Sequence, residues 1–119
     1  MNIQVHQVDS QEIAEATADY VLIKNIEDGL DLMGNIYYLG YDKLIIHQEH
    51  ITPDFFDLKT GVAGEILQKF SNYRVRLAIV GDFSRYESNS LKDFIFESNK
   101  QKHINFVSSV TEAVARLSA

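Results

Sequence analysis

Short apolar runs separated by polar turns recur along the chain, and each predicts a buried strand. Three of them cover residues 43–47 (KLIIH), 75–80 (VRLAIV) and 104–107 (INFV). These runs are too short for buried helices, and polar residues follow each of them. Near the amino terminus, apolar positions in residues 3–5 and 13–16 flank a turn at residues 8–11 (VDSQ), which predicts an antiparallel hairpin. Residues 20–23 (YVLI) either extend the sheet or enter the first helix.

Between these runs, apolar residues recur every three or four positions, which predicts four helices. The expected helices run from Asn25 to Gly40, from residues 52–54 to about Ser71, from Ser88 or Ser90 to about Asn99, and onward from Ser109. The second helix has alternative starts, because Thr52 can cap it with Pro53 at the first helical position, whereas Asp57 or Thr60 could begin it later. The fourth helix follows a capping box at residues 109–112 (SVTE).

Two glycines, Gly29 and Gly34, fall inside the first expected helix. Each weakens a helix by roughly 1 kcal/mol relative to alanine. We therefore expect another element to pack closely against this helix.

The predicted order of elements is β-β-α-β-α-β-α-β-α in a single α/β domain over residues 1–119. Strands that alternate with helices imply mainly parallel pairing with right-handed crossovers. The opening hairpin supplies an antiparallel strand. Three strand ends should then share one edge of the sheet, with His47 after the first run, Gly81 and Asp82 after the second, and Ser108 and Ser109 after the third. Open α/β folds usually place their sites at this carboxyl edge.

Composition and charge exclude several classes of function. Seventeen acidic and eleven basic residues give a net charge of −6, which disfavours a nucleic-acid partner and an anionic membrane surface. The basic residues at positions 74, 76, 100 and 102 are expected to be solvated surface charges. With no cysteine, the chain has no thiol chemistry and no disulfides. The first residues lack the pattern of a secretory signal, and no window is apolar enough for a membrane helix, so we expect a cytoplasmic protein.

The turn over residues 81–90 (GDFSRYESNS) is the first candidate site. Ser88 or Ser90 precedes a helix whose free N–H groups favour an anion, and Arg85 could add positive charge. The alternative is purely local, with Asp82 forming a turn and a serine capping the helix. A ligand site of His47, Asp82, Ser84, Arg85 and Ser88, and a catalytic triad of Ser84, His47 and Asp82, are both conceivable at this edge.

No other motif carries a complete signature. His47 and His50 could ligate a metal with Glu49 or Asp54, but no third ligand follows at a diagnostic spacing, so we expect no metal and no cofactor. The G-x-x-S sequence at 81–84 does not fit a nucleophile elbow, which leaves enzymatic activity uncertain and a non-enzymatic role favoured. Three tyrosines, Tyr37, Tyr38 and Tyr41, form either core, a pocket or a homodimer face.

Three segments, FFDLKTGVAGEILQKF (55–70), NYRVRLAIVGDFS (72–84) and SLKDFIFESN (90–99), resemble a family of small bacterial proteins known only as a domain of unknown function, number 4180. The resemblance extends over nearly the whole chain and implies no activity.

A looser resemblance is to STAS domains of the anti-sigma-factor antagonist type, which share the predicted order of elements. Their D-S-S-G-L signature resembles residues 57–62 (DLKTGV), although one residue is inserted here. The resemblance implies that Thr60 matches the hydroxyl that kinases modify. These observations favour a regulatory module that binds a protein partner, and the alternative is a small-molecule or anion-binding protein or small hydrolase that uses the carboxyl edge.

Overall fold

A computed structural model describes all 119 residues of the chain. Its order of elements is β1 (Asn2–Val8), β2 (Gln11–Thr17), α1 (Ile26–Tyr38), β3 (Lys43–His47), α2 (Val62–Asn72), β4 (Arg76–Val80), α3 (Asn89–Gln101), β5 (Ile104–Val107) and α4 (Val110–Leu117). Three short 3₁₀ turns, at Gln48–His50, Pro53–Phe56 and Leu58–Thr60, lie between β3 and α2. The predicted order of strands and helices is confirmed.

The five strands form one mixed sheet in which spatial order follows chain order, β1-β2-β3-β4-β5. The two-residue turn at Asp9 and Ser10 makes β1 antiparallel to β2, with Asp9 at φ +52°. The remaining neighbours pair in parallel. The expected single α/β domain with a mostly parallel sheet and an amino-terminal hairpin is thus confirmed.

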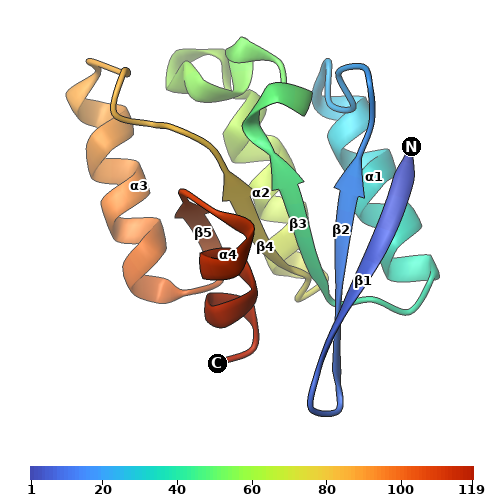
Figure 1. Ribbon diagram of the computed structural model, residues 1–119. Coiled ribbons are helices and arrows are strands. Elements are labelled where there is room, and N and C mark those ends of the chain that lie inside the picture. Colours follow the sequence, from blue (N-terminus) through green and yellow to red (C-terminus); the bar gives the residue numbers. More distant parts are fainter.

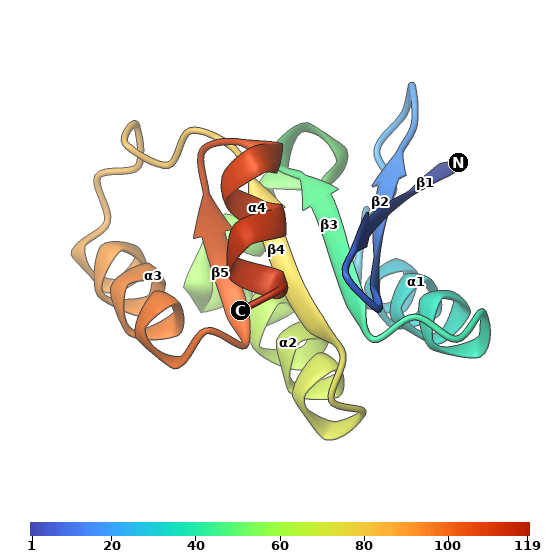
Figure 2. The same cartoon turned by 60° about the horizontal axis from the view of Figure 1, so that its bottom comes forward.

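Helices cover the two faces of the sheet unequally (Figures 1 and 2). Helices α1, α2 and α3 pack on one face around a core of 21 buried residues. On the opposite face, α4 lies alone over a smaller core that includes Ile45, Ala78, Val107 and Leu117. Helix α4 contacts β3, β4 and β5, and it leaves much of β1 and β2 without a covering helix.

Side-chain caps start most of the helices, as the sequence predicts. Asn25 accepts a hydrogen bond from Asp28 N in α1, and Ser88 accepts one from Leu91 N in α3. In α4, Ser109 accepts from Glu112 N, but the Glu112 carboxylate returns to the N–H of Ser108 rather than of Ser109. The predicted capping box therefore forms with its return bond displaced by one residue.

The expected start of α2 at Thr52–Asp54 is wrong. Thr52 and Asp57 do cap, but each caps a 3₁₀ turn, and α2 begins at Val62. Gly61, at φ +79°, separates the last turn from the helix. Of the predicted starts, Thr60 lies nearest to the observed one. Residues 20–23 are neither strand nor helix, because only Ile23 makes a single parallel bridge, to Ile51.

Two local expectations need correction. A Cβ at Gly29 would collide with Ile66 of α2, which confirms close packing there, but nothing lies near Gly34. Arg76 is not a solvated surface charge: its guanidinium donates to the carbonyls of Lys102, Arg116 and Leu117 at distances of 2.8–3.3 Å. Arg76 therefore ties β4 to the carboxyl end of α4, where free carbonyls attract a cation.

Candidate functional site

The strand ends that the sequence predicts to lie together do share one edge of the sheet. His47 at the end of β3 pairs in register with Val80 at the end of β4, so the loop that begins at Gly81 starts beside it. The Gln48 side chain joins the two loops: its Oε1 accepts from Asp82 N at 3.0 Å, and its Nε2 donates to the Tyr86 hydroxyl at 2.7 Å. The side chain of Gln48 also fills the space beside Gly81, where a Cβ would collide with it.

Within the 81–88 loop, the predicted site residues bind one another or the backbone. The Asp82 carboxylate accepts from the backbone N–H of Ser84 at 3.0 Å and from its hydroxyl at 2.6 Å. These hydrogen bonds lower the pKa of Asp82, which is fully exposed. Ser88 caps α3. Asp82, Ser84 and Ser88 thus have the turn-forming and capping geometry that the local alternative describes.

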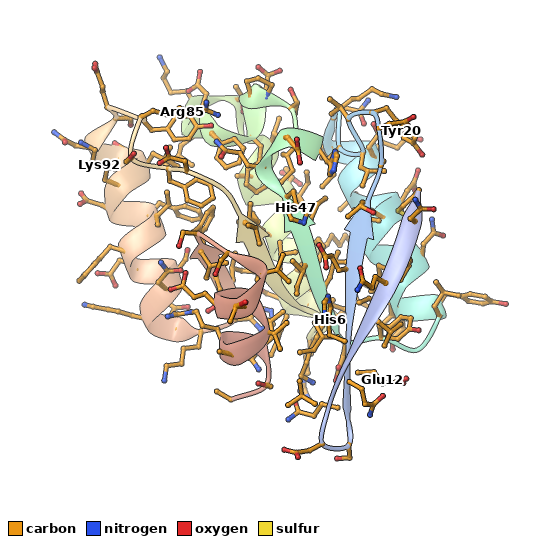
Figure 3. The ribbon with its side chains drawn as sticks, in the orientation of Figure 1. His6, Glu12, Tyr20, His47, Arg85 and Lys92 are labelled. Carbon is orange, nitrogen blue, oxygen red and sulfur yellow. The ribbon has the colours of Figure 1, made fainter.

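Aromatic side chains anchor this loop. Tyr86 stacks on Phe56 with ring centroids 5.3 Å apart, and Phe83 meets Phe106 edge to face at 5.3 Å. Arg85 is exposed, with its guanidinium 5.8 Å from the Tyr86 ring and no hydrogen-bond partner in the protein. It lines a shallow hollow of about 280 Å³ with Gln48, Phe56 and Tyr86. His47, Asp82 and Ser84 do not line that hollow, and Figure 3 shows Arg85 well apart from His47.

His47 lies instead in a cluster that the sequence did not indicate. Its Nε2 is 2.7 Å from Oε2 of Glu15 on β2, and Nε2 of His6 on β1 is 2.7 Å from Oε1 of the same carboxylate. One carboxylate therefore bridges imidazoles from the two flanking strands. The Glu15 side chain is 9% exposed, and those of His6 and His47 are 23% and 21% exposed.

The contacts in this cluster keep the Glu15 carboxyl ionised. Burial of the Glu15 carboxyl raises its pKa, but the hydrogen bonds and charge interactions with His47 and His6 together outweigh that effect, so the pKa lies below its usual value. An ionised carboxylate only accepts hydrogen bonds, so both histidines must donate Nε2–H to it. In a neutral imidazole this leaves Nδ1 as a bare acceptor, and neither Nδ1 has a partner in the protein.

These three side chains lie on the part of the sheet that α4 does not cover. Alternation along the strands places Gln4, His6, Glu15, Thr17 and His47 on the same face, and we call this surface the open face. Figure 3 labels His6 on β1 and His47 on β3 within it. Five hollows on the molecule are lined by other residues and by none of His6, Glu15 and His47, so the open face presents a surface rather than a pocket.

The metal hypothesis for residues 47–50 has no geometric support. The rings of His47 and His50 lie 6.1 Å apart at 79°, and His50 is buried. No three histidine, aspartate or glutamate side chains in the chain are placed to hold a metal ion.

The predicted phosphorylation site, Thr60, is exposed in the last 3₁₀ turn before α2. Its hydroxyl lies 2.7 Å from the carbonyl of Asp54 and 2.9 Å from that of Asp57, and it accepts from Val62 N at 3.2 Å. Thr60 therefore holds the two 3₁₀ turns against the start of α2.

Tyr37, Tyr38 and Tyr41, which the sequence assigns to a core, a pocket or a dimer face, lie in three different environments. Tyr38 is 90% exposed, whereas Tyr41 packs against the core. Tyr37 meets Tyr73 edge to face at 5.4 Å, and the two line an apolar hollow between α1 and α2 with Met33.

None of the helices has both the length and the apolar character needed to cross a membrane.

Comparison with known proteins gives one match. No curated protein and no solved structure matches the chain, so the STAS resemblance stays a prediction. The model of a family described as "Domain of unknown function (DUF4180)" matches residues 8–117. That match spans most of the 119 residues, includes Glu15 and His47 but not His6, and confirms the family resemblance seen in the sequence. The chain therefore belongs to the DUF4180 family.

Proposed function

We propose that this domain is a non-enzymatic protein-interaction module that docks a partner protein on the open face. The observation that carries this proposal is the Glu15 carboxylate, held by His6 and His47 on a sheet surface that no helix covers. Burying a charge costs free energy unless it is hydrogen-bonded, and here two strands supply the hydrogen bonds. Because the side chains are already held in place, a partner loses little of its binding energy in ordering them.

The chemistry of the open face identifies the kind of partner. In the neutral form of the two imidazoles their free Nδ1 atoms are acceptors, so a complementary surface presents hydrogen-bond donors. The chain carries a net charge of −6, which favours a partner of opposite sign. Together these features fit a basic protein surface rich in lysine, arginine or amide side chains.

The arrangement of the three residues that could conceivably form a triad, Ser84, His47 and Asp82, supports a non-enzymatic role. Asp82 and Ser84 bind each other within one turn, and the His47 Nε2 is directed at Glu15. A nucleophile and its base need to be within hydrogen-bond reach, and no such pair of Ser84 and His47 is formed.

The test is capture of a partner under conditions that separate the open face from other surfaces. His47→Lys replaces the ring with an ammonium group that can still donate to Glu15 and has no acceptor. Tyr38→Lys introduces the same group at a distant exposed position and serves as the control. We expect a protein that is retained by wild type and Tyr38→Lys, lost with His47→Lys, and released by added salt. A partner retained equally by all three proteins, or no reproducible partner, would overturn the proposal.

Thr60 is the proposed regulatory site of this module, as the STAS resemblance implies. A phosphoryl group on its oxygen removes the hydrogen that the hydroxyl donates to the carbonyls of Asp54 and Asp57, and adds charge beside two acidic residues. Phosphorylation would therefore loosen the 3₁₀ turns at the carboxyl edge. Thr60→Glu should change partner capture, with Thr60→Ser as the control that keeps the hydroxyl. Equal capture by Thr60→Glu and wild type would remove Thr60 from the proposal.

A second candidate function, binding of a small anion, rests on Arg85. Its guanidinium has no partner in the protein and borders the hollow beside Gln48 and Tyr86. Inorganic phosphate or sulfate should raise the melting temperature of the wild type but not of Arg85→Gln. Equal shifts, or none, exclude this function.

A further inference from the structure

The two edge strands of the sheet, β1 and β5, differ in whether another part of the chain bonds their outer backbone groups. At one edge, the Asn99 side chain of α3 accepts from Phe106 N at 2.7 Å and donates to Phe106 O at 3.2 Å. A side chain thereby takes the place of a further strand beside β5. At the other edge, no side chain and no loop bonds the outer backbone groups of β1.

The hairpin geometry shows which groups of β1 are free. A two-residue turn closes on a hydrogen-bonded pair, here Val8 and Gln11, and such pairs alternate along an antiparallel ladder. Asn2, Gln4, His6 and Val8 therefore bond β2. The N–H and C=O groups of Ile3, Val5 and Gln7 point away from the sheet.

The sequence of β1 has none of the residues that usually keep an edge strand from pairing with another chain. Its seven residues, NIQVHQV, include no lysine, aspartate, glutamate, arginine or proline. Natural proteins blunt exposed edges with charge, proline, bulges or a covering element. β1 has none of these, although the chain as a whole carries a net charge of −6.

We propose that β1 is the interface of a homodimer in which two copies pair antiparallel and join their sheets into one of ten strands. Val5 is the middle residue of β1, so all seven residues overlap only when Val5 of one copy faces Val5 of the other. Val5 is 39% exposed and apolar, and its outward N–H and C=O can both bond to the second copy.

A second copy suits this edge because of charge and symmetry. In the Val5-centred register, Ile3 faces Gln7 and Gln4 faces His6, so no like charges meet although each copy carries −6. Antiparallel pairing of identical strands is two-fold symmetric, and every favourable contact occurs twice. The pairing also places Gln4 of one copy on the same face as His6 of the other, which makes the two open faces continuous.

The experiment measures mass in solution and then locates the contact. Sedimentation at micromolar concentrations should give twice the chain mass for wild type. Val5→Lys sets two ammonium groups opposite each other and should weaken the dimer about tenfold or more. Tyr38→Lys adds the same charge on the exposed aromatic surface at the end of α1 and should leave the dimer intact. Circular dichroism and melting curves establish that both variants fold.

A cross-link gives an independent readout, because the chain has no cysteine of its own. Mild oxidation should link Val5→Cys into a disulfide dimer and leave Tyr38→Cys as monomer. The proposal is overturned if the wild type is monomeric, which would leave the edge to a strand from another protein. It is equally overturned if Tyr38→Lys rather than Val5→Lys dissociates the dimer, or if only Tyr38→Cys cross-links.

Discussion

The Gln48 side chain occupies the space beside Gly81 that any larger residue at position 81 would need. Its amide also bonds Asp82 N and the Tyr86 hydroxyl, so it cannot move away without breaking both contacts. We predict that Gly81→Ala lowers the free energy of unfolding by about 1–3 kcal/mol, as overpacking does. Gly34→Ala is the matched control, because nothing lies near Gly34 in its exposed position, and it should stabilise α1 by about 0.5–1 kcal/mol. Chemical denaturation of both variants measures the difference.

The bridging carboxylate predicts an acid-sensitive component of stability. Because the pKa of Glu15 is lower in the folded protein, its contribution is complete above the usual value near 4.5 and is lost as the pH falls through the folded pKa. Glu15→Gln should remove that component and cost about 1–3 kcal/mol at neutral pH, since an amide nitrogen faces one of the histidine donors. Unfolding free energies of the two proteins from pH 7 downward should converge below pH 4.5. Parallel curves would show that the carboxylate is not held as described.

His103 adds a second pH dependence in a different range. Burial lowers its pKa, a backbone hydrogen bond with Phe70 raises it, and the nearby Arg76 lowers it further; the pKa lies below its usual value. The unfolded chain therefore takes up a proton first as the pH falls below about 6.5, and stability decreases from there down to the folded pKa. Its Nε2 is buried without a partner, so His103→Leu should abolish this decrease. A wild-type stability that is flat between pH 7 and 5 would contradict the assignment.

Arg76 should be irreplaceable by another cation. Its planar guanidinium reaches carbonyls of Lys102, Arg116 and Leu117 at once, and a lysine ammonium cannot reproduce that geometry. Arg76→Lys should cost about 1–3 kcal/mol and speed amide exchange in the last turn of α4. Arg74→Lys, two residues earlier and exposed, should be neutral in both measurements.

Asn99 should protect the β5 edge. Asn99→Ala leaves both backbone groups of Phe106 without their partner, and we expect a loss of about 1–3 kcal/mol together with concentration-dependent aggregation. Asn35→Ala, on the exposed side of α1, is the control. Denaturation curves and light scattering separate the two effects, and a variant as stable and monodisperse as the control would refute this role.

The fold could be predicted because local signals agree with the tertiary structure. The apolar runs, the turn at residues 8–11 and the capping residues Asn25 and Ser109 each specify one element without reference to distant parts. The start of α2 could not be predicted, because Thr52 and Asp57 cap a 3₁₀ turn as well as they cap an α-helix. The left-handed conformation of Gly61 ends the 3₁₀ turn at Leu58–Thr60, and α2 begins at the next residue.

The candidate site was harder to predict because it depends on strand register. His6, Glu15 and His47 are far apart in sequence and meet only when β1, β2 and β3 align. One local signal was present: Glu15 is the single charge inside the apolar stretch Ile13–Ala16, where a carboxylate needs partners. The role of Arg76 could not be predicted for a similar reason, because the carbonyls that it binds come from residues 102–117.

The sheet's spatial order, identical to its chain order, has a consequence for synthesis on the ribosome. Each strand can be added beside the one made just before it, so a nascent chain never has to hold open a gap for a strand still to come. Helix α4 differs from the strands, because the surface of β3, β4 and β5 on which it packs is complete only after β5 has paired. Until residues 110–117 leave the exit tunnel, the apolar side chains of Ile45, Ala78 and Val107 face water. A ribosome-bound chain whose sheet has formed but whose α4 is still in the tunnel therefore offers this smaller core to chaperones.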